Sequence, residues 1–167
     1  MRGLIKVQYR RRAEGKTDYA ARKKFLEGKK PRIIVRKTNR YIIAQLVESK
    51  EAQDKVVCSV NSKELVGYGW PNKYSIKNLA ASYLAGYLLG KKMKQKKYQE
   101  AILDIGLIRS TKGNRMYAVL KGAVDAGIEI PFSEEILPSE KRIKGEHLDE
   151  NLKNIFEKVK GEIEKIK

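Results

Sequence analysis

The stretch that decides the fold forms two predicted strands and the turn between them: Pro31-Arg-Ile-Ile-Val-Arg-Lys-Thr-Asn-Arg-Tyr-Ile-Ile-Ala-Gln-Leu-Val47. Two runs rich in β-branched residues, Arg32–Lys37 and Arg40–Val47, flank a Thr38-Asn39 pair suited to a tight turn, so we predict a β-hairpin. A third strand is predicted over Lys55–Val60. Aliphatic residues come in adjacent pairs in all three runs, so each strand has bulky apolar side chains on both of its faces. This pattern favours a sheet that is covered on both sides.

Downstream, the pattern alternates between helix and strand: we expect a helix capped by Ser75, a strand over Ala101–Gly106, a helix over Thr111–Ala126 and a short strand over Ile128–Ile130. Residues 132–147 are expected to be mostly loop. The order β-β-β-α-β-α-β predicts an α/β fold with a mixed sheet of about five strands and helices on both faces.

Further elements are predicted at the two ends of the chain. Tyr19–Glu27 has the composition of a short helix, with Thr17 or Asp18 as its N-cap and Gly28 at its end. Residues 1–16 show no useful periodicity and predict a basic arm that becomes ordered only on a partner. Residues 148–167 carry apolar side chains at spacings of three and four, which predicts an amphipathic helix. Residues 17–147 between them should form a single domain.

Positive charge is concentrated at the start of the chain. The first forty residues hold fifteen Lys or Arg against three acids, which is +12 of the net +17. Such a cluster cannot be buried and gains most from a polyanion, whose counterions are released on binding. Tyr9 and Tyr19 stand among these cations and suit stacking on bases. Nucleic acid is therefore the predicted partner, and a solubilising tail is the alternative.

The remaining composition bears on location and chemistry. Charged residues interrupt every longer apolar run, so no membrane segment is expected, and residues 1–30 lack the apolar stretch of a signal peptide. The single cysteine, Cys58, can form no internal disulfide, which favours a reducing, cytoplasmic compartment. With His147 as the only histidine, a zinc cluster of His and Cys is not expected, and we predict no metal and no cofactor.

Six short segments follow one another in a recognisable order: Thr17-Asp-Tyr-Ala-Ala-Arg22, Pro31-Arg-Ile-Ile-Val-Arg-Lys-Thr-Asn-Arg-Tyr41, Ala101-Ile-Leu-Asp-Ile-Gly-Leu107, Thr111-Lys-Gly113, Leu120-Lys-Gly-Ala-Val-Asp-Ala-Gly127 and Ile143-Lys-Gly-Glu-His147. In this order and spacing, they resemble the archaeal form of the L-eighteen family of large-subunit ribosomal proteins, whose eukaryotic relative is called L-five. The resemblance covers about residues 8–148. The terminal helix departs from the bacterial pattern, which ends earlier.

The resemblance implies a specific role. Members of the family bind 5S rRNA and anchor it in the central protuberance of the large ribosomal subunit, beside a second 5S-binding ribosomal protein. The implied partners are therefore 5S rRNA, large-subunit rRNA and neighbouring ribosomal proteins, and the implied location is the cytoplasmic ribosome. The family's fold resembles the ribonuclease H-like sheet, and its members are not enzymes.

Two alternatives remain open at this point. A nuclease of ribonuclease H-like fold needs several carboxylates around two metal ions about 4 Å apart, yet the first strand carries no acid. Asp104 is the one acid well placed for such a role, and Arg109 is its candidate ion-pair partner. A protein–protein adaptor acting through the terminal helix is the other alternative, although we expect the apolar stripe of that helix to pack on its own domain.

The candidate RNA-binding residues lie on the arm, the first helix, the hairpin, the connector of residues 61–74 and around the start of the helix over Thr111–Ala126. They are Arg10, Arg11, Arg12, Lys16, Tyr19, Arg22, Lys23, Arg32, Arg36, Lys37, Thr38, Asn39, Arg40, Tyr41, Trp70, Arg109, Lys112 and Arg115. Trp70 could stack on a base or be buried in its connector. The sequence does not decide whether Lys91 to Lys97 face rRNA or solvent.

Overall fold

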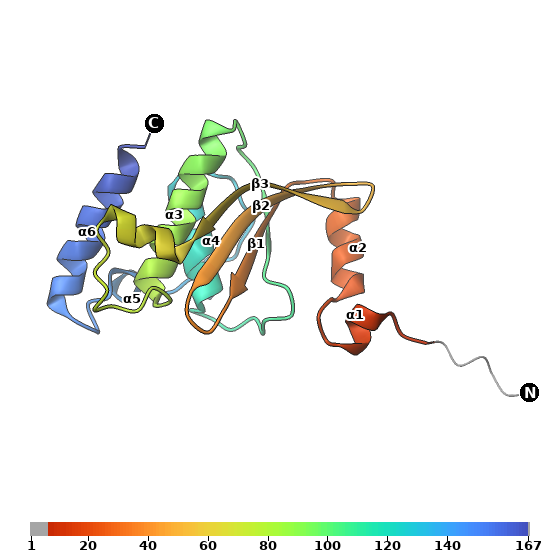
Figure 1. Cartoon of the computed structure of the whole chain (residues 1–167), viewed down its shortest axis with the longest axis horizontal. Coiled ribbons are helices and arrows are strands. Elements are labelled where there is room, and N and C mark those ends of the chain that lie inside the picture. Colours follow the sequence, from red (N-terminus) through yellow and green to blue (C-terminus); the bar gives the residue numbers. More distant parts are fainter. Residues whose placement is uncertain (1–6, 167) are drawn as a thin grey trace, which may run out of the picture.

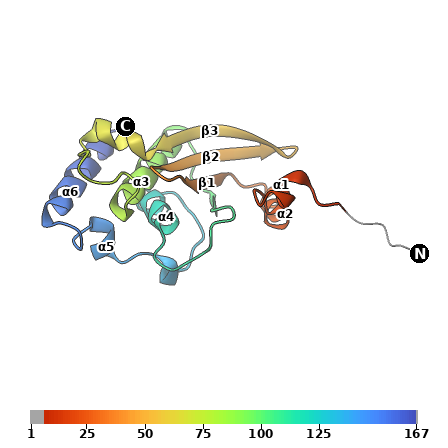
Figure 2. The same ribbon diagram turned by 60° about the horizontal axis from the view of Figure 1, so that its bottom comes forward.

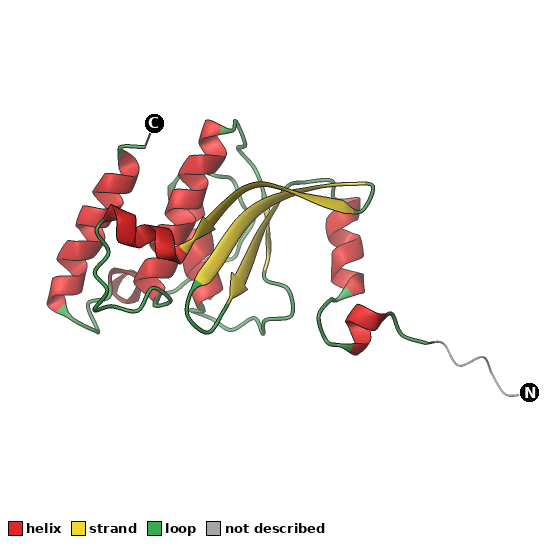
Figure 3. Cartoon of the chain, viewed as in Figure 1, coloured by secondary structure: helices red, strands yellow, loops and turns green. Residues whose placement is uncertain are grey.

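The fold is a mixed sheet packed against helices (Figures 1 and 3), and the computed structural model describes residues 7–166. The strands are β1 (Arg32–Lys37), β2 (Ile42–Lys50), β3 (Gln53–Asn61) and β4 (Ile102–Asp104). The α-helices are α1 (Arg10–Ala13), α2 (Tyr19–Glu27), α3 (Leu79–Gln95), α4 (Arg115–Asp125), α5 (Glu140–Lys144) and α6 (Glu150–Glu164). Two 3₁₀ helices are η1 (Ser62–Tyr68) and η2 (Glu134–Ile136). No helix in the described range is long and apolar enough to cross a membrane.

The strand order in the sheet is β3-β2-β1-β4. The predicted hairpin is confirmed, because β1 pairs antiparallel with β2 and Val35 lies opposite Ala44. β3 continues the antiparallel part, whereas β4 lies parallel to β1, with Ile33 opposite Leu103. This arrangement confirms the mixed α/β class that the sequence predicted.

The prediction of a fifth strand at Ile128–Ile130 is wrong, since the sheet of the described residues has four strands. This segment makes only an isolated parallel bridge, between Glu129 and Glu100. Pro131 follows directly and has no N–H to donate, so the ladder cannot be extended along β4.

Helices α3 and α4 cover one face of the sheet, on which Ile33, Val35 and Ala44 are fully buried (Figure 1). The two helices cross closely because glycines lie at the crossing. A Cβ atom at Gly86 would lie 2.0 Å from the Val119 carbonyl oxygen, which only glycine avoids.

α2 lies near the β2–β3 turn (Figure 2), and its residues Arg22 and Phe25 line one cleft with Arg32, whose side chain is on the face of β1 opposite to that of Ile33. The predicted range of this helix and its cap are confirmed: Asp18 Oδ1 accepts hydrogen bonds from the N–H groups of Ala20 and Ala21, at 2.9 and 3.1 Å. The ring of Phe25 lies 5.9 Å from the guanidinium carbon of Arg32, so α2 contacts the start of β1.

The terminal helix α6 packs on α3, as expected from its apolar stripe. Leu152 and Ile163 are fully buried, and the ring of Phe156 lies 5.4 Å from the ring of Tyr83 on α3. The Tyr87 hydroxyl donates a 3.0 Å hydrogen bond to Glu164 Oε1. The apolar face of α6 is therefore buried against α3 of the same chain.

Several boundaries differ from the sequence prediction: α4 begins at Arg115 rather than Thr111, and β4 ends at Asp104 rather than Gly106. α3 begins at Leu79, because Asn78 Oδ1 accepts a 2.7 Å hydrogen bond from the Ala81 N–H and acts as the cap that was assigned to Ser75. Residues 132–147, expected to be mostly loop, contain η2 and α5. Arg10–Ala13 forms a helical turn within the predicted arm, of which residues 1–6 lie outside the described range.

Candidate nucleic-acid interface

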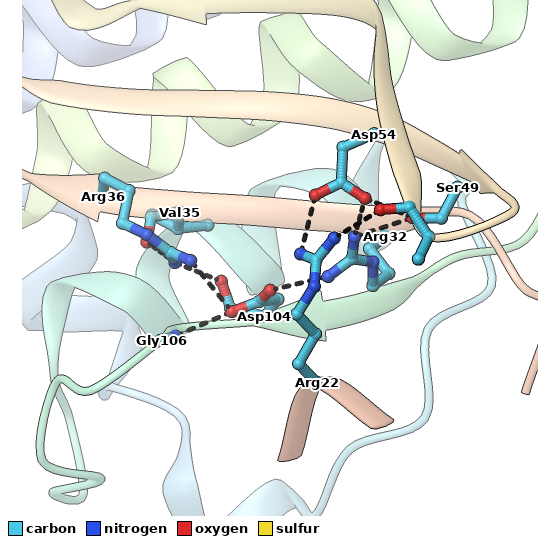
Figure 4. A network of polar contacts seen from close by, with 9 residues as sticks. Arg22, Arg32, Val35, Arg36, Ser49, Asp54, Asp104 and Gly106 are labelled. Atoms are coloured by element: carbon cyan, nitrogen blue, oxygen red, sulfur yellow. Dashed lines mark hydrogen bonds and ion pairs between the residues drawn. The ribbon is translucent and has the colours of Figure 1, made fainter. Parts of the chain in front are cut away.

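Three arginines from α2 and β1 converge on two carboxylates at the open face of the sheet (Figure 4). Arg32 is 2% exposed and donates hydrogen bonds to Asp104 at 3.2 Å, to Asp54 at 2.8 Å and to Ser49 at 2.8 Å. Its guanidinium is thus enclosed by protein acceptors. The burial contradicts the prediction that Arg32 contacts RNA, because a side chain held inside the fold cannot reach a phosphate. Alternation along a strand assigns Arg32 to one face of the sheet but does not identify the partners that enclose its side chain.

Asp104 is held by Arg36 as well as by Arg32. Arg36 donates 3.2 Å and 3.0 Å hydrogen bonds to Asp104 Oδ1 and to its carbonyl oxygen, while its side chain remains 44% exposed. The Gly106 N–H donates to the same carboxylate at 2.8 Å. The expected pairing of Asp104 with Arg109 is therefore wrong, and the carboxylate is committed to holding the β1–β4 pair together.

Asp54, at the start of β3, joins α2 to this network. Arg22 donates 2.8 Å and 3.0 Å hydrogen bonds to Asp54 Oδ2 and to the Ala52 carbonyl oxygen. Partial burial opposes ionisation of Asp54, but the hydrogen bonds from Arg22 and Ser49 and the charge of Arg32 outweigh it and lower its pKa to about 2. Asp54 is consequently ionised at neutral pH.

These elements enclose a cleft of about 310 Å³, which we name the N-terminal cleft. Its charged lining consists of five cations and three acids: Arg11, Lys16, Arg22, Arg32, Arg36, Asp18, Asp54 and Asp104. Most of the cations already have protein partners, since Arg11 Nε donates to Thr17 Oγ1 at 2.9 Å and Lys16 pairs with Glu14 at 2.8 Å. The structure therefore brings predicted residues of the arm, α2 and β1 together, with a local net charge of +2.

Predicted residues outside the cleft sit on the exposed side of α1 and α2. Arg10, Arg12 and Lys23 are exposed, and the rings of Tyr9 and Tyr19 lie 5.1 Å apart. Arg10 and Lys23 make only surface ion pairs, with Glu14 and Glu27, which contribute little to stability. These side chains are accessible to RNA.

The turn between β1 and β2 spans Thr38–Tyr41 and is held by Thr38. Its Oγ1 accepts a 3.0 Å hydrogen bond from the Tyr41 N–H and donates to the Tyr41 carbonyl at 2.8 Å. Lys77 donates to the Asn39 carbonyl at 2.7 Å, and Lys63 Nζ lies 4.5 Å from the centre of the Tyr41 ring. The side chains of Asn39 and Arg40 are exposed at this rigid tip.

A second concavity, of about 560 Å³, lies on the other side of the hairpin, and we name it the hairpin hollow. Its polar lining comprises Lys37, Asn78, Thr111, Lys112, Asn114, Arg115, Arg142 and His147. The structure thus brings the predicted residues Lys37, Lys112 and Arg115 together. Arg142 and His147 also line this hollow and were not among the predicted contacts, although His147 closes the last recognised segment. Arg109 is exposed and lies outside this lining.

Trp70 is the second predicted RNA contact that the structure contradicts. It is 1% exposed, and its indole Nε1 donates to the Tyr74 carbonyl at 3.3 Å, so the alternative of burial in the connector holds. In the lysine-rich end of α3, Lys92 and Lys96 reach protein acceptors, the Glu64 carboxylate at 2.7 Å and the Val57 carbonyl at 2.5 Å. Lys94 and Lys97 are exposed.

The described residues hold no group of three or more His, Cys, Asp or Glu side chains that could bind a metal ion. Asp104 is 6% exposed and occupied by two arginines. The carboxylate arrangement that ribonuclease H-type chemistry requires is therefore not assembled by these residues.

Comparisons with known proteins show the family to which the chain belongs. The chain matches the family described as "Ribosomal large subunit proteins 60S L5, and 50S L18" over residues 4–101 and 94–133. A relative from Korarchaeum cryptofilum (strain OPF8), named large ribosomal subunit protein uL18, is 56% identical over 146 residues, which make up 87% of this chain and 74% of the relative. Proteins of the same name from Methanoregula boonei and Methanothermobacter thermautotrophicus are 51% and 45% identical, over 85% and 91% of this chain and 80% and 78% of their own lengths. The chain therefore belongs to the family of the large-subunit ribosomal proteins 60S L5 and 50S L18.

Proposed function

We propose that this protein binds 5S rRNA and anchors it in the central protuberance of the large ribosomal subunit. Its family consists of ribosomal proteins of that subunit, so the coarser role, a structural constituent of the large subunit without enzymatic activity, follows from membership. The proposed partners are 5S rRNA, large-subunit rRNA and neighbouring proteins, including the second 5S-binding protein.

One observation carries the proposal: cations from segments distant in sequence lie around the N-terminal cleft and the hairpin hollow. Structured RNA is recognised mainly through its shape, its phosphates and its 2′-hydroxyl groups, which rigid concave basic surfaces fit. The rings of Tyr9 and Tyr19 lie 5.1 Å apart beside the basic residues of the arm, and unpaired bases in loops can stack on such rings. The proposed contact set is the predicted one without Arg32 and Trp70, which are buried.

The two alternatives lack a comparable observation. A nuclease needs carboxylates that Asp104, engaged by Arg32 and Arg36, does not supply. An adaptor acting through α6 needs a free apolar face, whereas the stripe of α6 is buried on α3.

The test is to sequence the RNA that copurifies with tagged protein, next to a tagged variant in which Arg10, Arg11, Arg12 and Lys16 are all changed to Gln. We expect 5S rRNA to be enriched with the parent protein and strongly reduced with the variant. Recovery of bulk RNA in cellular proportions, or new cleaved ends after incubation with Mg²⁺, would contradict the proposal.

A further inference from the structure

The cations that line the hairpin hollow differ from those of the N-terminal cleft, because three of the four have no ion-pair partner among the described residues. Lys37, Arg115 and Arg142 come from β1, α4 and α5, and none of their side chains donates a hydrogen bond to an acceptor among residues 7–166. Lys112 has a single partner, Glu135 at 3.1 Å, with both side chains more than 70% exposed. Such a surface pair contributes little, so it leaves the lysine free to exchange partners.

No acidic side chain lines this hollow, so four cations give it a local net charge of +4. Holding like charges together in one concavity is unfavourable in the free protein and becomes favourable when a polyanion supplies the counter-charge. The planar guanidinium groups of Arg115 and Arg142 also suit bidentate contacts to phosphate. The positive charge and the guanidinium groups of the hollow therefore suit the binding of a sugar–phosphate backbone.

The two basic concavities lie on opposite faces of the sheet. Arg36 lines the N-terminal cleft and Lys37 lines the hairpin hollow, and successive side chains of a strand point to opposite faces. The turn at Thr38–Tyr41 joins β1 to β2 at this end of the strand and is held by the Tyr41 N–H to Thr38 Oγ1 hydrogen bond. An RNA strand lying in the cleft and another lying in the hollow would thus approach β1 from opposite sides.

We propose that the β1–β2 hairpin separates two RNA backbone segments, one held in the N-terminal cleft and the other in the hairpin hollow. This inference rests on the proposed function and assigns its two surfaces to different RNA segments. The segment in the hollow is a sugar–phosphate backbone from one of two sources, a second region of 5S rRNA or the large-subunit rRNA.

The experiment is hydroxyl-radical footprinting of the full chain on 5S rRNA and on large-subunit rRNA. It compares the parent protein with two matched double variants. One carries Arg115→Gln and Arg142→Gln in the hollow, and the other carries Arg11→Gln and Lys16→Gln in the cleft. Each should lower the magnitude of the log–log salt slope by about 1.5 to 2. Far-ultraviolet circular dichroism and melting temperature are recorded to confirm that both variants are folded.

We expect each double variant to lose protection of its own set of nucleotides, with the other set retained. If the nucleotides that lose protection in the hollow variant lie in 5S rRNA, that RNA supplies the segment in the hollow. If they lie only in large-subunit rRNA, that RNA supplies it. Loss of the same nucleotides in both variants, or unchanged protection and affinity in the hollow variant, would overturn the two-segment arrangement. If the parent protein shows no preference for 5S rRNA over tRNA, the proposed function is refuted instead. In that case, two separate sets of protected nucleotides on large-subunit rRNA would still support the two-segment arrangement.

Discussion

The N-terminal cleft and the hairpin hollow are both basic, yet they use their cations differently. In the cleft, Arg22, Arg32 and Arg36 hold Asp54 and Asp104, so the charge there also stabilises the fold. In the hollow, Lys37 and Arg142 contact no acid of the described chain. The comparison teaches that a count of Lys and Arg does not measure what is available to RNA. Variants of Arg22 and Arg36 in the cleft should change stability and binding together, whereas variants of the hollow should change binding alone.

The largest expected effect is on stability, from Asp104→Ala. Removing this carboxylate leaves Arg32 buried with fewer acceptors, and breaking a buried ion pair from one side costs about 3 kcal/mol or more. We expect the free energy of unfolding, measured by urea titration and circular dichroism, to fall by about that amount. The matched control is Arg142→Ala in the hollow, which should stay within about 0.5 kcal/mol of the parent. Equal losses of unfolding free energy in the two variants would contradict the proposed difference between the two concavities.

A second prediction concerns the arm, residues 1–16. Its described residues, 7–16, are all exposed, so deletion should leave the melting temperature almost unchanged. The arm carries six cations against Glu14 alone, so affinity for 5S rRNA at low salt should fall by about tenfold or more. Filter binding and differential scanning calorimetry measure the two quantities. A large drop in melting temperature with intact RNA binding would show that the arm belongs to the core.

Sequence patterns predicted the elements whose signals are local. The hairpin, the Asp18 cap of α2 and the apolar stripe of α6 depend on neighbours within a few residues, and the structure confirms them. Burial of Trp70 was one of the two alternatives that the sequence left open, whereas the burial of Arg32 could not be predicted in this way. It depends on partners brought close by folding, such as Asp104, which lies 72 residues after Arg32.

Arg142 illustrates the same limit for the candidate site. It stands in a region that the sequence suggested to be mostly loop, and only the folding of α5 beside the start of α4 places it next to Arg115. The recognised segment Ile143-Lys-Gly-Glu-His147 directly after it was the one available signal. Charge and motifs thus predicted a basic, RNA-binding protein. Tertiary packing determines which of its cations have no protein partner.

The smallest expected effect is the dependence of cleft stability on pH. The pKa of Asp54 is lowered to about 2 in the folded protein, so its contribution is fully present above the unfolded value near 4 and is lost as pH falls from there through about 2. Because this site is partly exposed, solvent screening reduces the contribution to about 1 kcal/mol. Urea unfolding of the parent and of Asp54→Asn should therefore differ at pH 6 and converge near pH 2. A difference that persists at pH 2 would assign the effect to packing rather than to charge.

The most direct test of the central claim, that two basic concavities bind rRNA through its backbone, is the salt dependence of 5S rRNA binding by the parent protein. Equilibrium filter binding over a series of salt concentrations gives the slope of log K against log salt. The four cations of the hollow alone predict a negative slope of about 3 or steeper, at about 0.7 to 0.9 per phosphate contact. A slope near zero between low and moderate salt would contradict the account.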